Sequence, residues 1–135
     1  MQKKVLADTN IFVYYSEGRK DAVSFFKKVR VLDDFCIYVL EDVYAEAKTV
    51  SFNFDKIRNI ISELYSKGIY QRVKLNEQEK EYAEKLSQRS IEEFGHVIDR
   101  TDRRIIAVAK FRNLKIHSND NELLILAQKE GIAIY

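Results

Sequence analysis

Short apolar runs alternate with longer amphipathic stretches along this chain. A buried strand shows a continuous apolar run, whereas an amphipathic helix repeats its apolar positions every three or four residues. The runs predicted to be strands cover residues 4–8, 36–40, 69–75, 114–117 and 132–135. The run at 69–75 alternates apolar and polar positions, which favours a place at a sheet edge. Alternating strands and helices indicate a parallel sheet with helices on its faces.

The amphipathic stretches are bounded by residues that begin or end helices. Helices are predicted over residues 20–31, 41–50, 54–67, 76–95, 101–112 and about 119–131, with a shorter helical segment from near residue 10. Asn76 and Glu79 form a capping-box arrangement, and Gly68 is well placed to follow a helix. The chain has no proline and only four glycines, which favours helices joined by short turns.

Composition narrows the class of protein. The 135 residues, 46% hydrophobic and 33% charged, are typical of one globular domain, predicted here as 1–135. No apolar run approaches the ~20 residues that span a membrane, and the N-terminus lacks the apolar segment of a signal peptide. The single Cys36 excludes an internal disulfide and a multi-thiolate zinc site. We therefore expect a cytoplasmic protein without a membrane partner.

The net charge of +2 is too small to indicate a nucleic-acid partner by itself. Uniformly basic nucleic-acid binders are far more positive. A nuclease is still compatible with this balance, because metal ions neutralise an acidic site and local basic patches contact the phosphates.

Acidic residues follow two of the predicted strands. Asp8 ends the first apolar run, and Asp120 comes shortly after the run at 114–117. In an open parallel sheet, ligands bind beyond the carboxyl ends of the strands, so these side chains are candidates for a binding site. Each also has an ordinary explanation, because an aspartate at the start of a helix caps it.

The second predicted strand runs directly into several acids. If the next helix begins near Glu41, Glu46 lies just past its first turn and can point back toward the strand ends. Glu41 and Asp42 then lie in the first turn, where the helix dipole favours acids without any further function. Asp42 takes the place of Glu46 if the helix starts earlier, so the second acid of the site is either of the two.

Asp102 lies on the apolar face of the helix predicted at 101–112, because Ile105 follows it by three residues. An acid on such a face needs a partner, and a metal ion would supply one. The alternatives are a first-turn acid that compensates the dipole, or an acid paired with Arg103 or Arg104. Asp99 is a further candidate acid.

Several carboxylates placed together without counterions repel one another, and some are forced to protonate. Mg²⁺ and Mn²⁺ accept carboxylate and water ligands and would relieve this repulsion. One ion lowers the pKa of an attacking water, and a second would stabilise the departing 3′ oxygen of an RNA chain. His96 and His117 lack zinc-ligand spacing, so we expect both to be structural or solvent-facing.

Four stretches resemble the PIN-domain ribonucleases, a family that includes the VapC-like toxins and related archaeal proteins. They are VLADTN at 5–10, YAE at 44–46, DRRIIAVA at 102–109 and KIHSND at 115–120. They occur in the family's order and with family-like spacing over nearly the whole chain. The resemblance implies a three-layer α/β/α fold with a central parallel sheet of about 4–5 strands.

The same resemblance implies an endoribonuclease that hydrolyses phosphodiester bonds of RNA with one or two Mg²⁺ or Mn²⁺ ions. It implies that the metal ligands and catalytic residues are Asp8, Glu46, Asp102 and Asp120. It implies supporting or substrate-binding roles for Thr9, Asn10, Ser118 and Asn119. It also implies a homodimer and, for a toxin, a small antitoxin protein as partner.

One departure from the family keeps a second function open. The family commonly has a small residue after the third acid, and here Arg103 and Arg104 follow Asp102. The arginines would either bind substrate phosphate or place an internal cation where a metal would bind. The second case describes a degenerate PIN domain that binds RNA or protein without cutting.

Two other classes of small α/β protein fit less well. A phosphoacceptor receiver domain needs paired acids after the first strand, and only Asp8 stands there. A haloacid-dehalogenase-type phosphatase needs a second acid at the position of Asn10, which is an amide.

Overall fold

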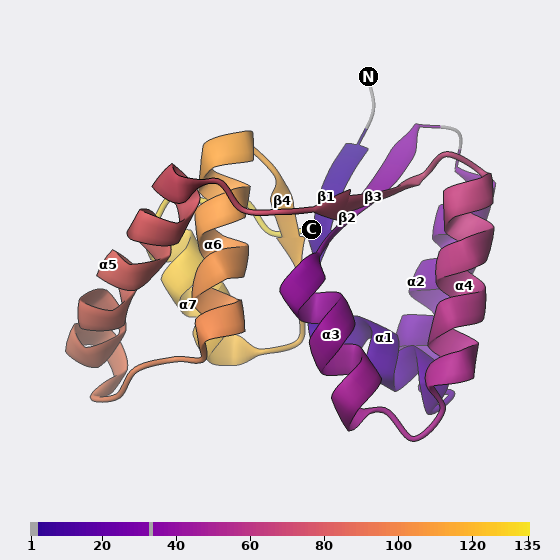
Figure 1. The fold of residues 1–135 in the computed structure, drawn as a ribbon, viewed down its shortest axis with the longest axis horizontal. Coiled ribbons are helices and arrows are strands. Elements are labelled where there is room, and N and C mark those ends of the chain that lie inside the picture. The colour runs from indigo at the N-terminus through magenta and orange to yellow at the C-terminus, as the bar shows by residue number, and fades with distance from the viewer. Residues whose placement is uncertain (1–2, 33) are drawn as a thin grey trace.

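A computed structural model describes residues 3–32 and 34–135. These residues form four strands and seven helices (Figure 1). In chain order they are β1 (Lys3–Ala7), α1 (Thr9–Ser16), α2 (Lys20–Val31), β2 (Phe35–Leu40), α3 (Glu41–Val50), α4 (Phe54–Ser66), β3 (Tyr70–Val73), α5 (Glu77–Phe94), α6 (Arg100–Arg112), β4 (Lys115–His117) and α7 (Asn121–Lys129).

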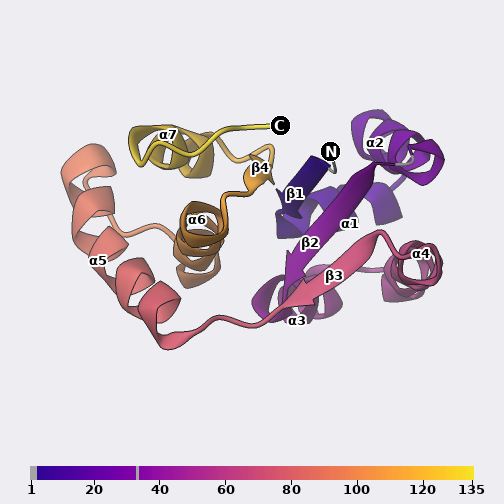
Figure 2. The same cartoon turned by 90° about the horizontal axis from the view of Figure 1, so that it is seen from above.

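The sheet is parallel, with the strand order β3-β2-β1-β4. Helices α1 to α4 cover one face and α5 to α7 cover the other, as the view from above shows (Figure 2). The predicted three-layer α/β/α fold with a central parallel sheet is therefore confirmed, with four strands in the sheet. The alternating run at 69–75 supplies β3, which lies at the edge as predicted.

The capping signals begin and end the helices as the sequence predicts. The Asn76 side chain accepts from the Glu79 backbone N–H, and the Glu79 carboxylate accepts from the Asn76 N–H, both at 2.9 Å. Gly95 ends α5 in the left-handed region at φ 78°, where a side chain would be strained. Helices α2 and α3 have the predicted bounds, and the segment near residue 10 forms α1.

The fifth predicted strand, at 132–135, is wrong. Only a single bridge pairs Ile134 with Ile116, beside a β4 that is itself three residues long. Two backbone hydrogen bonds form this bridge: the Ile116 N–H donates to the Ala133 carbonyl, and the Tyr135 N–H donates to the Ile116 carbonyl. The first strand also ends one residue earlier than predicted, so Asp8 lies just beyond it.

The core lies on both faces of the sheet. Val5, Leu6 and Ala7 of β1 are completely buried, as expected for a strand between two others and under two layers of helices. Across the described residues, we find no helix with the length and apolar character needed to cross a membrane. Because β1 is rigidly enclosed, the residue that follows it has a fixed position.

Candidate functional site

The sheet order reverses beside β1. β2 and β3 lie on one side of this strand and β4 lies on the other, so the carboxyl ends of β1 and β4 flank the crevice where open α/β sheets bind ligands. Ala7 pairs with His117, and the Asp8 N–H donates to the His117 carbonyl at 3.1 Å. The residues that follow these two strands therefore meet.

Asp8 is held firmly at this point and is only 4% exposed. Its Oδ1 accepts from the Thr9 N–H at 2.7 Å, and its Oδ2 accepts from the Ser118 hydroxyl at 2.8 Å. Burial raises the pKa of Asp8, although these two hydrogen bonds oppose the rise. Asp8 also caps α1, so the ordinary explanation is correct as far as it goes. A cap does not need to be buried, and the burial calls for a further explanation.

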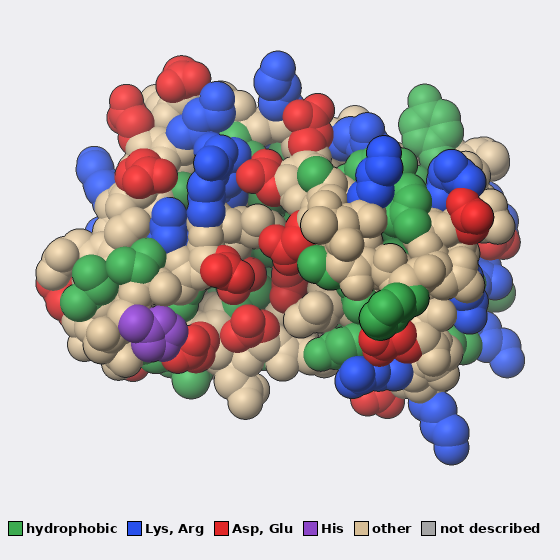
Figure 3. Space-filling view, turned by 60° about the horizontal axis from the view of Figure 1, so that its bottom comes forward, with side chains coloured by type: hydrophobic (Ala, Val, Ile, Leu, Met, Phe, Trp, Pro, Cys, Tyr) green, Lys and Arg blue, Asp and Glu red, His purple; other side chains and the backbone are tan. Residues whose placement is uncertain are grey.

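Three other acids lie close enough to act on this carboxylate or on one another. The charges of Asp120 and Glu46 contribute to the raised pKa of Asp8. Burial, followed by the charges of Asp8, Asp120, Asp99 and Glu46, raises the pKa of Asp102 to about 8. Asp and Glu side chains gather where the two groups of helices meet on this face (Figure 3). We call Asp8, Glu46, Asp102 and Asp120 the acid cluster.

No Lys, Arg or His within 3–32 and 34–135 forms an ion pair with a member of the acid cluster. The two arginines after Asp102 point elsewhere. The Arg104 guanidinium pairs with Asp42 at 2.9 Å, and that of Arg103 donates to the Ile98 carbonyl at 2.5 Å. The hypothesis of an internal cation in the metal position therefore finds no support in their contacts.

The ion pair with Arg104 also separates the two candidates for the second acid. α3 begins at Glu41, which puts Glu46 past its first turn. The Asp42 carboxylate is compensated by the guanidinium. Glu46 is half-buried and raises the pKa of both Asp8 and Asp102. The structure thus brings Glu46 to the cluster.

The supporting residues differ in how closely they approach. Ser118 is buried and links two acids, because its oxygen donates to Asp8 and accepts from the Asp120 N–H at 3.0 Å. Thr9 is buried, and its hydroxyl has no hydrogen-bond partner among the described residues. Asn10 is half-buried and Asn119 is exposed. A buried hydroxyl without a partner beside a carboxylate cluster is available to a ligand or a bound water.

The acid cluster fits a hard cation in its chemistry. In the part of the chain that the structure describes, no three His, Cys, Asp or Glu side chains converge as a ready-made metal cage. Mg²⁺ does not require one, since it is usually bound by one or two carboxylates together with waters and substrate phosphate. The raised pKa values of the buried Asp8 and the half-buried Asp102, together with the unpartnered Thr9 hydroxyl, match that need.

The two histidines lie outside the cluster, as predicted. His117 stacks on Phe25 with ring centroids 4.2 Å apart, and burial lowers its pKa. His96 is exposed, and its Nε2 lies 2.8 Å from the Glu122 carboxylate. Neither histidine has the setting of a zinc ligand or of a general base for the acid cluster.

Comparisons with known proteins agree with this fold. No protein-family profile and no curated protein matches the sequence. Among solved structures, VapBC2 of Rickettsia felis, bound to a DNA fragment from its promoter, is similar with a TM-score of 0.68 and 15% identity over 98% of this chain and 97% of that one. VapC20 of Mycobacterium tuberculosis, a sarcin-ricin loop cleaving toxin, gives 0.68 and 11% over 90% and 94%. VapBC-1 of nontypeable Haemophilus influenzae gives 0.65 and 19% over 98% and 96%. The chain shares the PIN-like fold of these proteins.

Proposed function

We propose that this PIN-like chain is a divalent-metal-dependent endoribonuclease, and that it is the toxin of a toxin–antitoxin pair. The observation that carries the proposal is the acid cluster, four carboxylates from the β1–α1 junction, α3, α6 and the β4–α7 turn without an ion-paired cation among the described residues. Buried acids in a purely structural role are normally paired. An unpaired group of acids at a ligand-binding crevice favours a cation that arrives with, or before, the substrate.

The chain's own residues would hold Mg²⁺ or Mn²⁺ and orient the RNA. Asp8 is the anchor, because the Thr9 N–H and the Ser118 hydroxyl fix its carboxylate. Glu46, Asp102 and Asp120 complete the ligand set, and Thr9, Asn10 and Asn119 line its approach. A bound ion supplies an activated water and neutralises charge on the scissile phosphate. Because the carboxylates would hold the ion and the ion would activate the water, RNA hydrolysis needs no histidine or cysteine.

The similar structures support an antitoxin protein as the proposed partner. A toxin–antitoxin complex from Klebsiella pneumoniae and the toxin VapC20 have a similar fold, and FitAB, in a further similar structure, is bound to a DNA fragment. We propose a small antitoxin protein as partner for this chain, a homodimer as its assembly, and the cytoplasm as its location. Co-expression with the product of a neighbouring small reading frame, followed by size-exclusion chromatography, tests the first two.

RNA cleavage by the purified chain tests the catalytic proposal. We expect cutting of single-stranded or structured RNA in Mg²⁺ or Mn²⁺ and none in EDTA. Asp8→Asn keeps the size of the side chain but removes its charge, and should lower the rate by about 1000-fold, since a metal contributes several kcal/mol to the transition state.

The matched control is Asp21→Asn. Asp21 is an exposed acid in the first turn of α2, outside the acid cluster, so the Asp21→Asn variant should cut RNA at the normal rate. Robust cleavage in EDTA, or full activity of Asp8→Asn, would show that the proposal is wrong.

A second candidate function rests on a specific observation, which is that the described acids do not already converge as a cage. Under this alternative the chain is a degenerate PIN domain that binds RNA or protein without cutting. Crystals soaked in Mn²⁺ separate the two functions. Metal density between Asp8 and Asp102 supports the nuclease, and its absence supports the binding module.

A further inference from the structure

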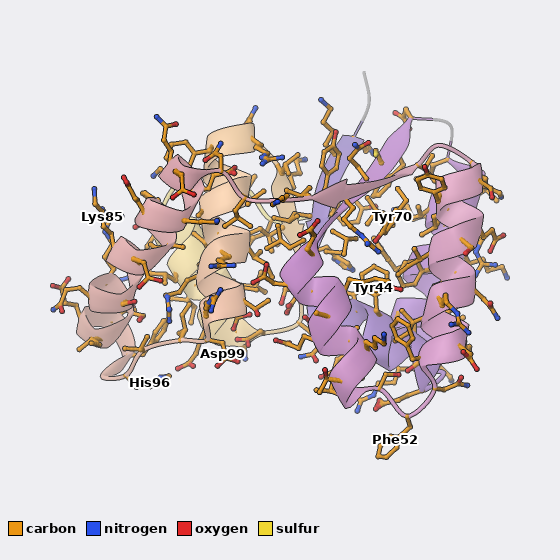
Figure 4. The ribbon with its side chains drawn as sticks, viewed as in Figure 1. Tyr44, Phe52, Tyr70, Lys85, His96 and Asp99 are labelled. Atoms are coloured by element: carbon orange, nitrogen blue, oxygen red, sulfur yellow. The ribbon has the colours of Figure 1, made fainter. Side chains whose placement is uncertain are left out.

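A pocket lies between α3, α4 and the edge strand β3, away from the acid cluster. It has a volume of about 540 Å³, and the acid cluster contributes no residue to its lining. Tyr44 comes from α3 and Tyr70 from β3, and both lie in the region that α3, α4 and β3 enclose (Figure 4). Further lining residues are Arg72, Arg58, Ser62 and Tyr65.

The sequence pattern explains why these residues meet. Tyr70 and Arg72 are two apart on a strand, so their side chains leave the same face of the sheet. Arg58, Ser62 and Tyr65 recur at intervals of four and three on α4, so they share one face of that helix. The pocket therefore presents aromatic rings, hydroxyls and guanidinium groups together.

Arg72 carries a positive charge that no acid compensates. Its guanidinium lies over the Tyr44 ring, 4.2 Å from the centroid, and among the described residues it forms no ion pair with a carboxylate. Stacking on the ring holds the side chain in place, and the guanidinium has more N–H donors than its two hydroxyl neighbours, Tyr44 and Tyr70, so donors remain for a ligand. A fixed, uncompensated guanidinium beside a pocket is a receptor for an anion such as phosphate.

The floor and the rim of the pocket point to an aromatic ligand as well. The Tyr70 hydroxyl is buried, and its O–H has no acceptor within the described residues; burial raises its pKa, and a hydrogen bond from Arg72 and the Arg72 charge oppose the rise. A ligand atom or a water carried in with it would satisfy that hydroxyl. Tyr65 is 72% exposed, which leaves a ring face open for stacking. Bases stack on such rings with little dependence on sequence.

We propose that this pocket binds one nucleotide unit, with the phosphate on Arg72 and the base against Tyr65. The unit is either a free mononucleotide or one unpaired residue of an RNA chain. The inference does not depend on the acid cluster being catalytic, because the two sites share no residue. Arg58 adds a second guanidinium, which among the described residues pairs only with Asp55 on the surface of α4.

Calorimetric titration of the full chain with adenosine 5′-monophosphate in EDTA tests the proposal. Arg72→Met keeps much of the apolar stem and removes the charge, and should weaken binding by about tenfold or more, the loss of one charge-assisted contact. The matched control is Arg19→Met. Arg19 also stacks on a tyrosine, 3.9 Å from the Tyr14 ring, but it pairs with Glu17 and lies outside the pocket, so binding should not change.

A second variant covers the case in which Arg72→Met does not fold. Tyr65→Leu changes an exposed side chain and should weaken binding of the nucleotide while leaving that of inorganic phosphate unchanged. A pentaadenylate that binds more tightly than the mononucleotide, and loses affinity in Arg72→Met, identifies the ligand as an RNA residue. Tighter binding of the mononucleotide than of pentaadenylate identifies the ligand as a free nucleotide.

Three results would overturn the proposal. The first is equal affinity of Arg72→Met and the unchanged chain for adenosine 5′-monophosphate and for pentaadenylate. The second is inorganic phosphate that binds as tightly as adenosine 5′-monophosphate. The third is no binding of adenosine 5′-monophosphate or of pentaadenylate.

Discussion

Two regions of this molecule bury carboxylates, and they treat them in opposite ways. Glu79 of α5 is completely buried, and Arg112 of α6 donates to it from Nε at 2.8 Å and from a terminal nitrogen at 2.9 Å. Burial alone would raise the pKa of Glu79, but the Arg112 hydrogen bonds and the Asn76 N–H hold it below its usual value. In the acid cluster the pKa values of Asp8 and Asp102 are raised instead.

The difference separates a structural acid from a functional one. A buried acid that joins two helices carries its own cation, and the pair is complete within the fold. The acid cluster brings its carboxylates together beside one another without such a cation among the described residues, so folding works against their repulsion. An arrangement that costs stability persists where a ligand from outside relieves the cost.

The largest effect on stability is expected in the complete pair. Arg112→Met should lower the free energy of unfolding by about 3–4 kcal/mol, because it leaves the Glu79 charge buried and unpaired. Urea denaturation at neutral pH measures this. Arg19→Met, which breaks the exposed pair with Glu17, should cost no more than about 1 kcal/mol. Similar costs for the two variants would mean that the Glu79 pair does not stabilise the fold.

The pH dependence should run in opposite directions in the two regions. Asp102 has a raised folded pKa, so its contribution to stability is present below about pH 4 and is lost as the pH rises through about 8. Glu79 has a lowered pKa, so its contribution is lost only as the pH falls below its ordinary value of 4.5. In EDTA, the free energy of unfolding should therefore fall by about 1.4 kcal/mol per pH unit between about pH 5 and 7.

Asp102→Asn tests the assignment of that slope. The Asn side chain does not titrate, so the fall in stability over this range should become much smaller, with a remainder from Asp8, whose pKa is also raised, while Glu79→Gln should leave the slope unchanged. A flat profile in the unchanged chain would show that Asp102 is not forced to hold its proton.

Metal binding should stabilise one region only. At a free Mn²⁺ concentration about 30 times the dissociation constant, the free energy of unfolding should rise by about 2 kcal/mol at neutral pH. Thermal denaturation with and without EDTA measures the change. The increase should vanish in Asp8→Asn and remain in Glu79→Gln, and its persistence in Asp8→Asn would place the ion elsewhere.

The smallest effect is expected at the border of the acid cluster. Arg104 pairs with Asp42, and both side chains are partly buried, so Arg104→Gln should cost about 1 kcal/mol. The same variant removes the ion pair of the Asp42 carboxylate, which could then bind a metal ion. Metal affinity should stay within about twofold if Glu46 is the second ligand, whereas a tenfold tighter Mn²⁺ complex would assign that place to Asp42.

The sequence predicted most of the fold and the positions of the candidate acids. Helices α2 and α3, the box at Asn76 and the edge position of β3 follow from periodicity and local hydrogen bonding, which act within a few residues. The prediction of a strand at 132–135 was wrong because strand pairing depends on a neighbouring strand and not only on the segment's own apolar pattern. The pocket of Tyr44 and Arg72 was missed, although the spacing of Tyr70 and Arg72 already placed them on one face.

What the sequence determined by itself is local, namely which residues form each element and which acids stand at element ends. Only the tertiary structure decided the partners of those acids. Ser118 reaches Asp8 across 110 positions of sequence because β4 lies beside β1, and the Arg104 side chain of α6 reaches Asp42 of α3 across 62 positions. Charges and hydrogen bonds act through space over a few ångströms, so strand order and helix packing determine which acids are compensated and which are left for a ligand.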